Sequence, residues 1–127
     1  MTQGGRDFVR LRAWAAMADD ELAKVIDADS IAALRRVVWL IDDSRSAPLP
    51  LDRADFVATV RTMERLYSEG ARSLGEAMNE AQACCDQRDA ARARAAFERF
   101  IARCGSRFHR DIARLQLKKL AGSGPER

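Results

Sequence analysis

Apolar side chains recur at intervals of three and four residues along most of this 127-residue chain. The longest series has spacings of 4, 3, 4, 4, 3, 4, 3 and 4. Its members are Phe56, Val60, Met63, Tyr67, Ala71, Leu74, Met78, Ala81 and Cys85. This period places apolar groups along one face of an α-helix. No alternating apolar run bounded by a hairpin turn predicts a strand. The sequence therefore predicts an all-α fold.

Two helices are predicted before the long series. The first runs from about Asp7 to Ile26, and residues 27–30 form a short break with capping residues. The second helix carries a further apolar face, made of Ile31, Leu34, Val38 and Ile41. Trp39 lies off that face, which favours a place at the rim of the core over a role as a partner-binding anchor.

The long series predicts one helix over residues 53–85. Gly70 and Gly75 each weaken this helix by about 1 kcal/mol relative to Ala. The apolar series stays in phase past both glycines, so we expect one long helix, with or without a kink. The alternative is a new helix that starts from a capping box of Ser73 and Glu76.

Two shorter helices follow a turn at residues 86–89. The first ends at Gly105 and carries an inward face of Ala93, Phe97, Phe100 and Cys104. The second is capped by Ser106 and carries Phe108, Ile112, Leu115 and Leu120. We therefore expect a small four- or five-helix bundle with one long central helix. It forms a single domain over residues 1–121, with a linker at residues 44–51 and a disordered tail at residues 122–127.

The composition indicates a small core. Apolar types make up 47% of the chain, but 23 residues are Ala, and Leu, Ile, Val and Phe together number 27. A domain with so few large apolar side chains gains stability from a partner or a second copy. We therefore expect a protein partner or self-association, with a dimer as one form.

The residues that could do chemistry do not form a recognisable site. A triad of Ser106, His109 and Asp111 would place all three groups within two helical turns, whereas such triads draw on separate elements around a pocket. We expect His109 to be a surface or capping-region histidine. A zinc site from the three cysteines and His109 fails because a helical hairpin would hold Cys85 and Cys104 far apart. The sequence predicts no enzyme, and no catalytic, cofactor or metal site.

The N-terminal residues 1–7 lack the apolar run of a signal peptide. No stretch approaches the roughly 20 apolar residues of a membrane span. The three cysteines are too few, and odd in number, for a disulfide framework. We therefore expect a cytoplasmic protein with no membrane partner.

Charge is distributed unevenly along the chain. Residues 1–87 contain 11 Lys and Arg against 15 Asp and Glu, whereas residues 88–127 contain 11 against 4. The basic segment carries two rows of arginine, one per helix: Arg92, Arg99 and Arg103, then Arg107, Arg110 and Arg114. These rows could bind an acidic protein or nucleic-acid phosphates. The alternative is a solvated face whose arginines pair with the long helix through Glu64, Glu69, Glu76 and Glu80.

The C-terminal half also resembles a known family. Ser68–Leu74 leads to the Asp-containing break at residues 86–89, and the series continues through Ala90–Arg92, Phe108–Ala113 and Gln116–Leu117. This succession resembles the DUSAM domain, a family of small paralogous myxobacterial proteins of unknown function, over roughly residues 53–121. Where the family tends to have Val-Pro before the aromatic–Arg pair, this chain has Gly105–Arg107. The resemblance implies a bacterial cytoplasmic protein and no activity.

The sequence favours a non-catalytic function. We expect a helical protein–protein interaction or regulatory module whose contact surface includes the two arginine rows. The alternative is a small RNA- or DNA-associated subunit of a larger complex. Aromatic side chains do not interleave with the arginines, which weakens binding to single-stranded nucleic acid.

Overall fold

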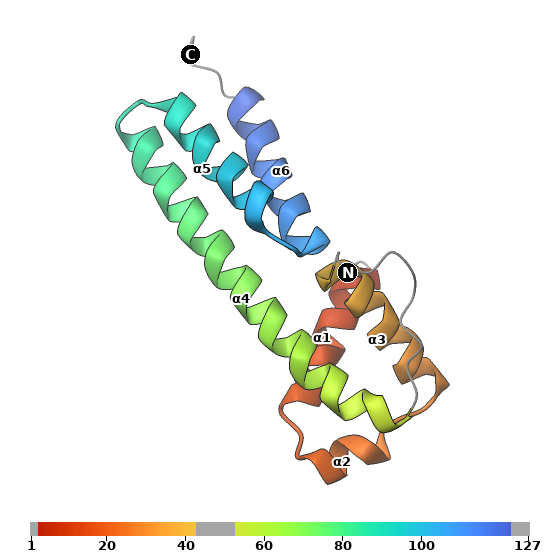
Figure 1. Ribbon diagram of the computed structural model, residues 1–127. Helices are drawn as coiled ribbons and strands as arrows, with labels where there is room; N and C mark the ends of the chain where they lie inside the picture. Colours follow the sequence, from red (N-terminus) through yellow and green to blue (C-terminus); the bar gives the residue numbers. More distant parts are fainter. Residues whose placement is uncertain (1–2, 43–52, 123–127) are drawn as a thin grey trace. The chain divides into compact units, whose positions relative to one another are not determined.

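A computed structural model describes residues 3–42 and 53–122 (Figure 1). Within these ranges every regular element is an α-helix. The helices are α1 (Gln3–Ala15), α2 (Asp19–Lys24), α3 (Ala28–Ile41), α4 (Arg53–Asp86), α5 (Ala90–Arg103) and α6 (Arg107–Gly122). The predictions of an all-α fold and of one long central helix are confirmed. The predicted linker at 44–51 lies outside the described residues, as does the predicted tail apart from Gly122, which ends α6.

The first predicted helix is divided in two, so six helices are described where four or five were predicted. Residues 16–18 separate α1 from α2. The acidic residues Asp19, Asp20 and Glu21 favour a new helix N-terminus at this point, because carboxylates stabilise the positive end of the helix dipole. The Oε1 atom of Glu21 also accepts a hydrogen bond from the backbone N–H of Ala18 at 3.1 Å. Ala18 itself is exposed.

A side chain from α4 completes the turn between α1 and α2. The guanidinium of Arg61 donates to the backbone oxygens of Ala15 at 2.8 Å and Met17 at 2.6 Å. It also pairs with the carboxylate of Asp19 at 2.8 Å. The last carbonyls of a helix have no partner within the helix itself. Arg61 therefore supplies hydrogen-bond donors for these carbonyls, which the residues around the break do not supply.

The chain folds into two compact units, Met1–Ser68 and Glu69–Arg127, and α4 contributes to both. In the first unit, α1 and α3 pack against each other. Trp14 on α1 meets Phe56 on α4 edge to face with ring centroids 5.2 Å apart, and Phe8 lies 4.8 Å from Tyr67. The buried core also includes Leu11, Leu22, Leu34, Val37, Ile41, Val60 and Met63.

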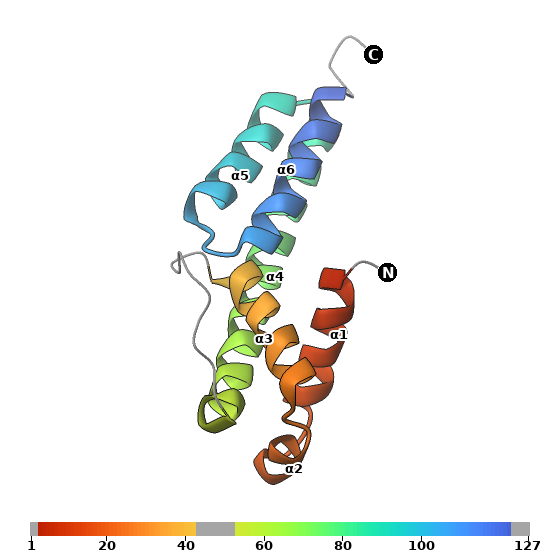
Figure 2. The same ribbon diagram turned by 90° about the vertical axis from the view of Figure 1, so that its right-hand side faces the viewer.

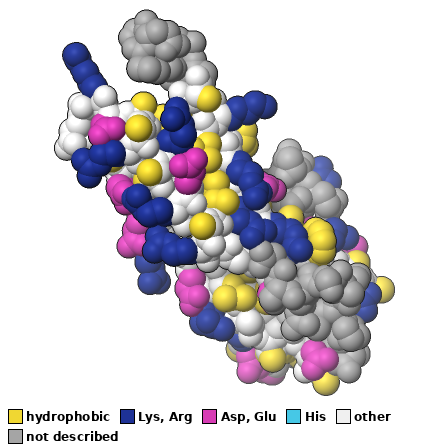
Figure 3. Space-filling view, turned by 45° about the horizontal axis from the view of Figure 1, so that its top comes forward, with side chains coloured by type: hydrophobic (Ala, Val, Ile, Leu, Met, Phe, Trp, Pro, Cys, Tyr) yellow, Lys and Arg dark blue, Asp and Glu magenta, His cyan; other side chains and the backbone are white. Residues whose placement is uncertain are grey.

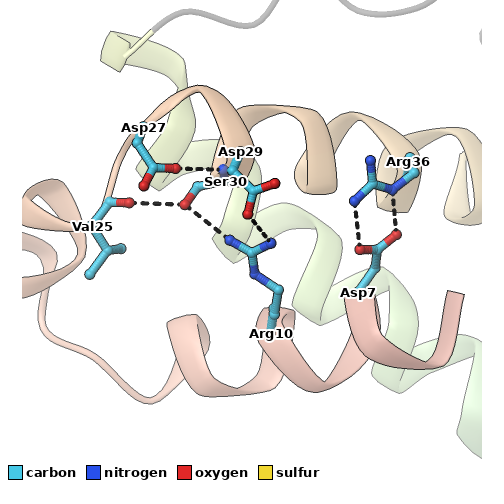
Figure 4. Close-up of polar contacts among 7 residues, drawn as sticks. All are labelled: Asp7, Arg10, Val25, Asp27, Asp29, Ser30 and Arg36. Atoms are coloured by element: carbon cyan, nitrogen blue, oxygen red, sulfur yellow. Dashed lines mark hydrogen bonds and ion pairs between the residues drawn. The ribbon is translucent and has the colours of Figure 1, made fainter. Parts of the chain in front are cut away.

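Polar contacts fix the antiparallel register of α1 and α3 (Figure 4). The carboxylate of Asp7 is 1% exposed and accepts two hydrogen bonds from Arg36, at 2.8 and 3.0 Å. At the other end of the pair, Arg10 donates to Asp29 at 2.9 Å and to Ser30 at 3.3 Å. Asp27 caps α3 by accepting from the backbone N–H of Ser30 at 2.7 Å. This hydrogen bond lowers the pKa of the Asp27 carboxyl below its usual value.

The second unit contains the later turns of α4 together with α5 and α6, which run side by side in both views (Figures 1 and 2). One buried cluster joins the three helices: Leu74, Ala77, Ala81, Cys84, Ala93, Ala96, Phe97, Phe100 and Ala113. Ile101, Ile112, Leu117 and Leu120 are half-buried against it. The predicted inward face of residues 90–104 therefore agrees with the structure. On α6, Leu115 was predicted to lie on the apolar face, but it is 56% exposed.

The buried line of α4 also differs from the predicted one beyond Tyr67. The structure buries Leu74, Ala77, Ala81 and Cys84, and leaves Ala71 and Met78 exposed. The observed series passes through Gly70 in place of Ala71, so its spacings alternate strictly between four and three. That is the 3.5-residue repeat of helices that pack along a long seam. The sequence prediction skipped Gly70 because glycine has no side chain to bury.

Candidate functional site

The arginines of α5 lie mainly at the surface. Arg92 is 71% exposed, with Nε 4.0 Å from the carboxylate of Asp89. Arg99 is 54% exposed and pairs with Glu80 on α4, itself half exposed. Arg103 lies one turn further on and donates from Nε to the backbone oxygen of Arg99 at 3.4 Å. The structure therefore brings Arg99 and Arg103 together on one exposed face of α5.

The arginines of α6 differ from one another. Arg114 is 56% exposed and pairs with Asp111 in its own helix at 3.0 Å. Arg107 is half-buried. Arg110 is half-buried as well and donates to the backbone oxygen of Cys104 at 3.2 Å. Because that contact joins the start of α6 to the end of α5, Arg110 holds the turn between these helices, and the row Arg107, Arg110, Arg114 is not a uniform exposed surface.

Among the exposed arginines of the two rows, Arg99 pairs with the long helix through Glu80. The pairs of Arg92 and Arg114 are local ones within three residues. Exposed ion pairs of this kind contribute about 0–1 kcal/mol each. A binding partner could therefore exchange them at little cost. Dark blue Lys and Arg side chains are interspersed with magenta and yellow ones on the face drawn in Figure 3.

Leu115 adds an apolar group to this basic segment. Its side chain is 56% exposed on α6. The exposed Arg114 precedes it, and the exposed Lys118 and Lys119 lie one turn further along the helix. Phe97 and Phe100 are buried, so they present no ring to a ligand at the surface. The exposed surface of α5 and α6 thus combines aliphatic and cationic groups.

His109 lies in the capping region of α6, which was one of the two expected settings. It does not lie at the surface, because its side chain is buried with 1% exposure. Its Nδ1 atom lies 2.7 Å from the hydroxyl of Ser106, which also accepts a hydrogen bond from the backbone N–H of His109 at 3.2 Å. This second contact makes Ser106 the N-cap of α6. Burial lowers the pKa of His109 below its ordinary value.

Gly70 explains how a histidine fits in this place. A Cβ atom at Gly70 would lie 2.5 Å from Nδ1 of His109 and 2.7 Å from Cε1. The imidazole ring therefore packs directly on the backbone of α4. Sequence reasoning missed this contact, although one signal was available: the strict alternation of four and three includes Gly70 in the buried line.

The Ser106, His109 and Asp111 side chains do not converge. Ser106 and His109 touch, but the carboxylate of Asp111 is 70% exposed and pairs with Arg114. The cysteines are also separated: Cys84 and Cys85 end α4, whereas Cys104 follows α5, whose 14 residues span roughly 21 Å. Among the described residues, no three His, Cys, Asp or Glu side chains are grouped to hold a metal ion.

None of the helices in residues 3–42 and 53–122 has the length and apolar character needed to cross a bilayer. Comparison of the chain with known protein families, with curated proteins and with solved structures finds no match.

Proposed function

We propose that this protein is a non-catalytic helical module that binds an acidic protein partner through the exposed arginines of α5 and α6. The exposed members of the two rows are Arg92, Arg99, Arg103 and Arg114. The observation that carries the proposal is the 56% exposure of Leu115 within the most basic segment of the chain. Protein interfaces combine such an apolar contact with a charged rim.

The chemistry of this surface favours a protein over a nucleic acid. Phosphates attract arginine, but affinity for single strands also draws on aromatic rings that stack with bases. The aromatic rings of α5 are buried, and an exposed leucine offers no stacking face. A leucine between cations suits an acidic helix that carries its own apolar stripe.

The test compares two variants with the same loss of charge. The first is Arg99→Ser/Arg103→Ser/Arg114→Ser, and the control is Arg12→Ser/Arg72→Ser/Arg94→Ser, which removes three exposed arginines outside the rows. Arg110 is left intact because it holds the turn before α6. Each immobilised chain is used to capture proteins from lysate of the source cell, and the captured proteins are quantified by mass spectrometry.

The expected result is an acidic protein that the wild type and the control capture equally. Its recovery falls at least tenfold with the row variant, and also with Leu115→Ser. Equal recovery by all chains would rule out this surface. The alternative function is tested with a labelled 20-nucleotide strand. The surface would be assigned to nucleic acid if the logarithm of the association constant fell linearly with the logarithm of salt concentration and the row variant lost binding.

Two other parts of the proposal do not depend on the binding experiment. Self-association, including dimer formation, follows from the small core and is tested by sedimentation velocity over a range of protein concentrations. Membership of the DUSAM family, with a bacterial and cytoplasmic origin, rests on the succession of residues within 53–121. That membership would supply no activity, so the binding experiment does not depend on it.

A further inference from the structure

We propose that His109 makes the packing of α6 on α4 sensitive to acid: the neutral imidazole holds the first turn of α6 in place, and protonation releases it. This inference is independent of the proposed binding function. It rests on the cluster of His109, Ser106 and Gly70.

The ring is enclosed on the side of α4. The His109 side chain is 1% exposed, and its Nε2 atom is buried as well. Because a Cβ at Gly70 would lie 2.5 Å from Nδ1, the space between the ring and the α4 backbone cannot hold a water molecule. A positive charge formed here could be hydrated only if the ring moved away from Gly70.

Ser106 links the imidazole ring to the cap of α6. Its oxygen accepts from the backbone N–H of His109 at 3.2 Å and lies 2.7 Å from Nδ1, and the tautomer of the ring sets the direction of this second hydrogen bond. A ring that moves away from Gly70 on protonation therefore pulls on Ser106, so the same event disturbs the cap of α6.

The charged and titratable groups next to the cluster along the chain are of both signs. They are Glu69 beside Gly70 on α4, Cys104 before the turn, and Arg107, Arg110 and Asp111 on α6, and the two carboxylates are exposed. The two arginines carry the same sign of charge as an imidazolium. Burial lowers the pKa of His109.

Release should begin at the first turns of α6. The later part of the helix is held by apolar contacts of Leu117 and Leu120 with the core of the second unit. The first turn depends on Ser106, on His109 and on the contact of Arg110 with Cys104. Acid should therefore open residues 106–113 before it affects α5.

The first measurement uses the fact that His109 is the single histidine of the chain. Its ring C–H signals in an NMR pH titration are therefore assigned without further labelling. We expect a midpoint clearly below the ordinary value of 6.5. A midpoint at or above 6.5 would overturn the proposal, because a ring that protonates as easily as a free one is not held neutral by the fold.

The second measurement is amide hydrogen exchange of the full chain at pH 7.5 and pH 5.5, corrected for the intrinsic rates. If the open form titrates near 6.5 and the closed form far lower, opening of residues 106–113 should increase about tenfold at the lower pH. Residues 93–100 of α5 should show no such increase. Unchanged exchange in residues 106–113, or an equal increase in α5, would contradict the mechanism.

The variant His109→Asn separates protonation from packing. Its side-chain amide can occupy the position of Nδ1, as donor or acceptor, but does not ionise in this range. Exchange at residues 106–113 should then be the same at both pH values, whatever its absolute level. A tenfold acid response that persists in His109→Asn would assign the effect to another group and overturn the role of His109.

Discussion

Gly70 and Gly75 occupy the same helix but have opposite surroundings. A Cβ at Gly70 would collide with the ring of His109, whereas a Cβ at Gly75 would meet nothing within 4 Å. The His109 ring cannot move aside easily, because it is buried and hydrogen-bonded to Ser106. The backbone of α4 therefore requires glycine at one position and only tolerates it at the other.

We predict that Gly70→Ala destabilises the protein and that Gly75→Ala stabilises it. Both substitutions gain about 1 kcal/mol of helix propensity. At Gly70 the clash outweighs that gain, since overpacking a close contact costs about 1–3 kcal/mol. Urea unfolding followed by far-UV circular dichroism gives the two free energies. A stabilised Gly70→Ala protein would show that the ring does not lie against α4.

Arg88 has a backbone conformation that favours glycine. Its φ is 58°, and the amide of Asp89 donates to the oxygen of Cys84 while that of Arg88 donates to Cys85. This is the Schellman pattern at the end of α4, in which the left-handed position is usually glycine. Asp89 then caps α5 through the amide of Arg92 at 3.1 Å.

We predict that Arg88→Gly raises the free energy of unfolding by about 1 kcal/mol, because glycine adopts the left-handed conformation without a steric penalty. Arg88→Ala serves as the control: it removes the exposed side chain but keeps the strained backbone. Thermal unfolding of the three proteins compares them. If Ala stabilised as much as Gly, the gain would come from the lost charge and not from the backbone.

At the scale of the elements, α1 and α3 are joined by a pair of unequally buried charges. Asp7 is 1% exposed, whereas the Arg36 side chain is 42% exposed. The bidentate contact with Asp7 raises the pKa of Arg36, so the guanidinium stays charged. The two partners should therefore respond differently to removal.

We predict that Arg36→Met destabilises the first unit by about 3 kcal/mol, because it leaves a buried carboxylate without its main counter-charge. Asp7→Asn should cost less, since water can hydrate the half-exposed Arg36. Arg35→Met, which removes a neighbouring exposed arginine, should stay within about 0.5 kcal/mol of the wild type. Tryptophan fluorescence during urea unfolding reports the transition, because Trp14 lies in the same core. Equal losses for Arg36→Met and Arg35→Met would contradict the role of the pair.

The sequence predicted the helices better than the faces they bury. Period and capping residues located α3, α4, α5 and α6, because these signals are local. The register of α4 beyond Tyr67 and the burial of His109 depend on a contact between residues 70 and 109. In the sequence alone, a glycine that is covered by a side chain from another helix cannot be told from a glycine that only weakens its own helix. The exposure of Leu115 has the same origin, because His109 and Ala113 occupy the inward face of α6 instead.

At the scale of the whole molecule, Asp27 and His109, two described residues with lowered pKa values, act in different pH windows. The unfolded chain takes up a proton on His109 as the pH falls below about 6.5, while the folded chain resists it. The Asp27 carboxyl, whose pKa is lowered by its hydrogen bond to the Ser30 amide, contributes stability above 3.8 that is lost at lower pH. Both groups therefore make acid destabilising.

We predict that the contribution of Asp27 and His109 to the free energy of unfolding is constant from pH 7 to 8. It then falls below pH 6.5 with a slope of at most about 1.4 kcal/mol per pH unit, the value for one proton. A second decline begins below pH 4. Urea unfolding by circular dichroism at several pH values measures the curve. His109→Asn should remove the first decline, and Asp27→Ser, which keeps a capping hydroxyl, should remove the contribution of the carboxyl to the second.

The contact of Arg61 with Ala15 bridges 46 residues of sequence. A ribosome makes the chain from its N-terminus, so α1 emerges long before the arginine that binds its last carbonyls. Nascent chains that end before residue 61 should therefore hold residues 3–15 less firmly than the finished protein does. Translation past Arg61 is thus a precondition for the turn between α1 and α2 to reach its final form.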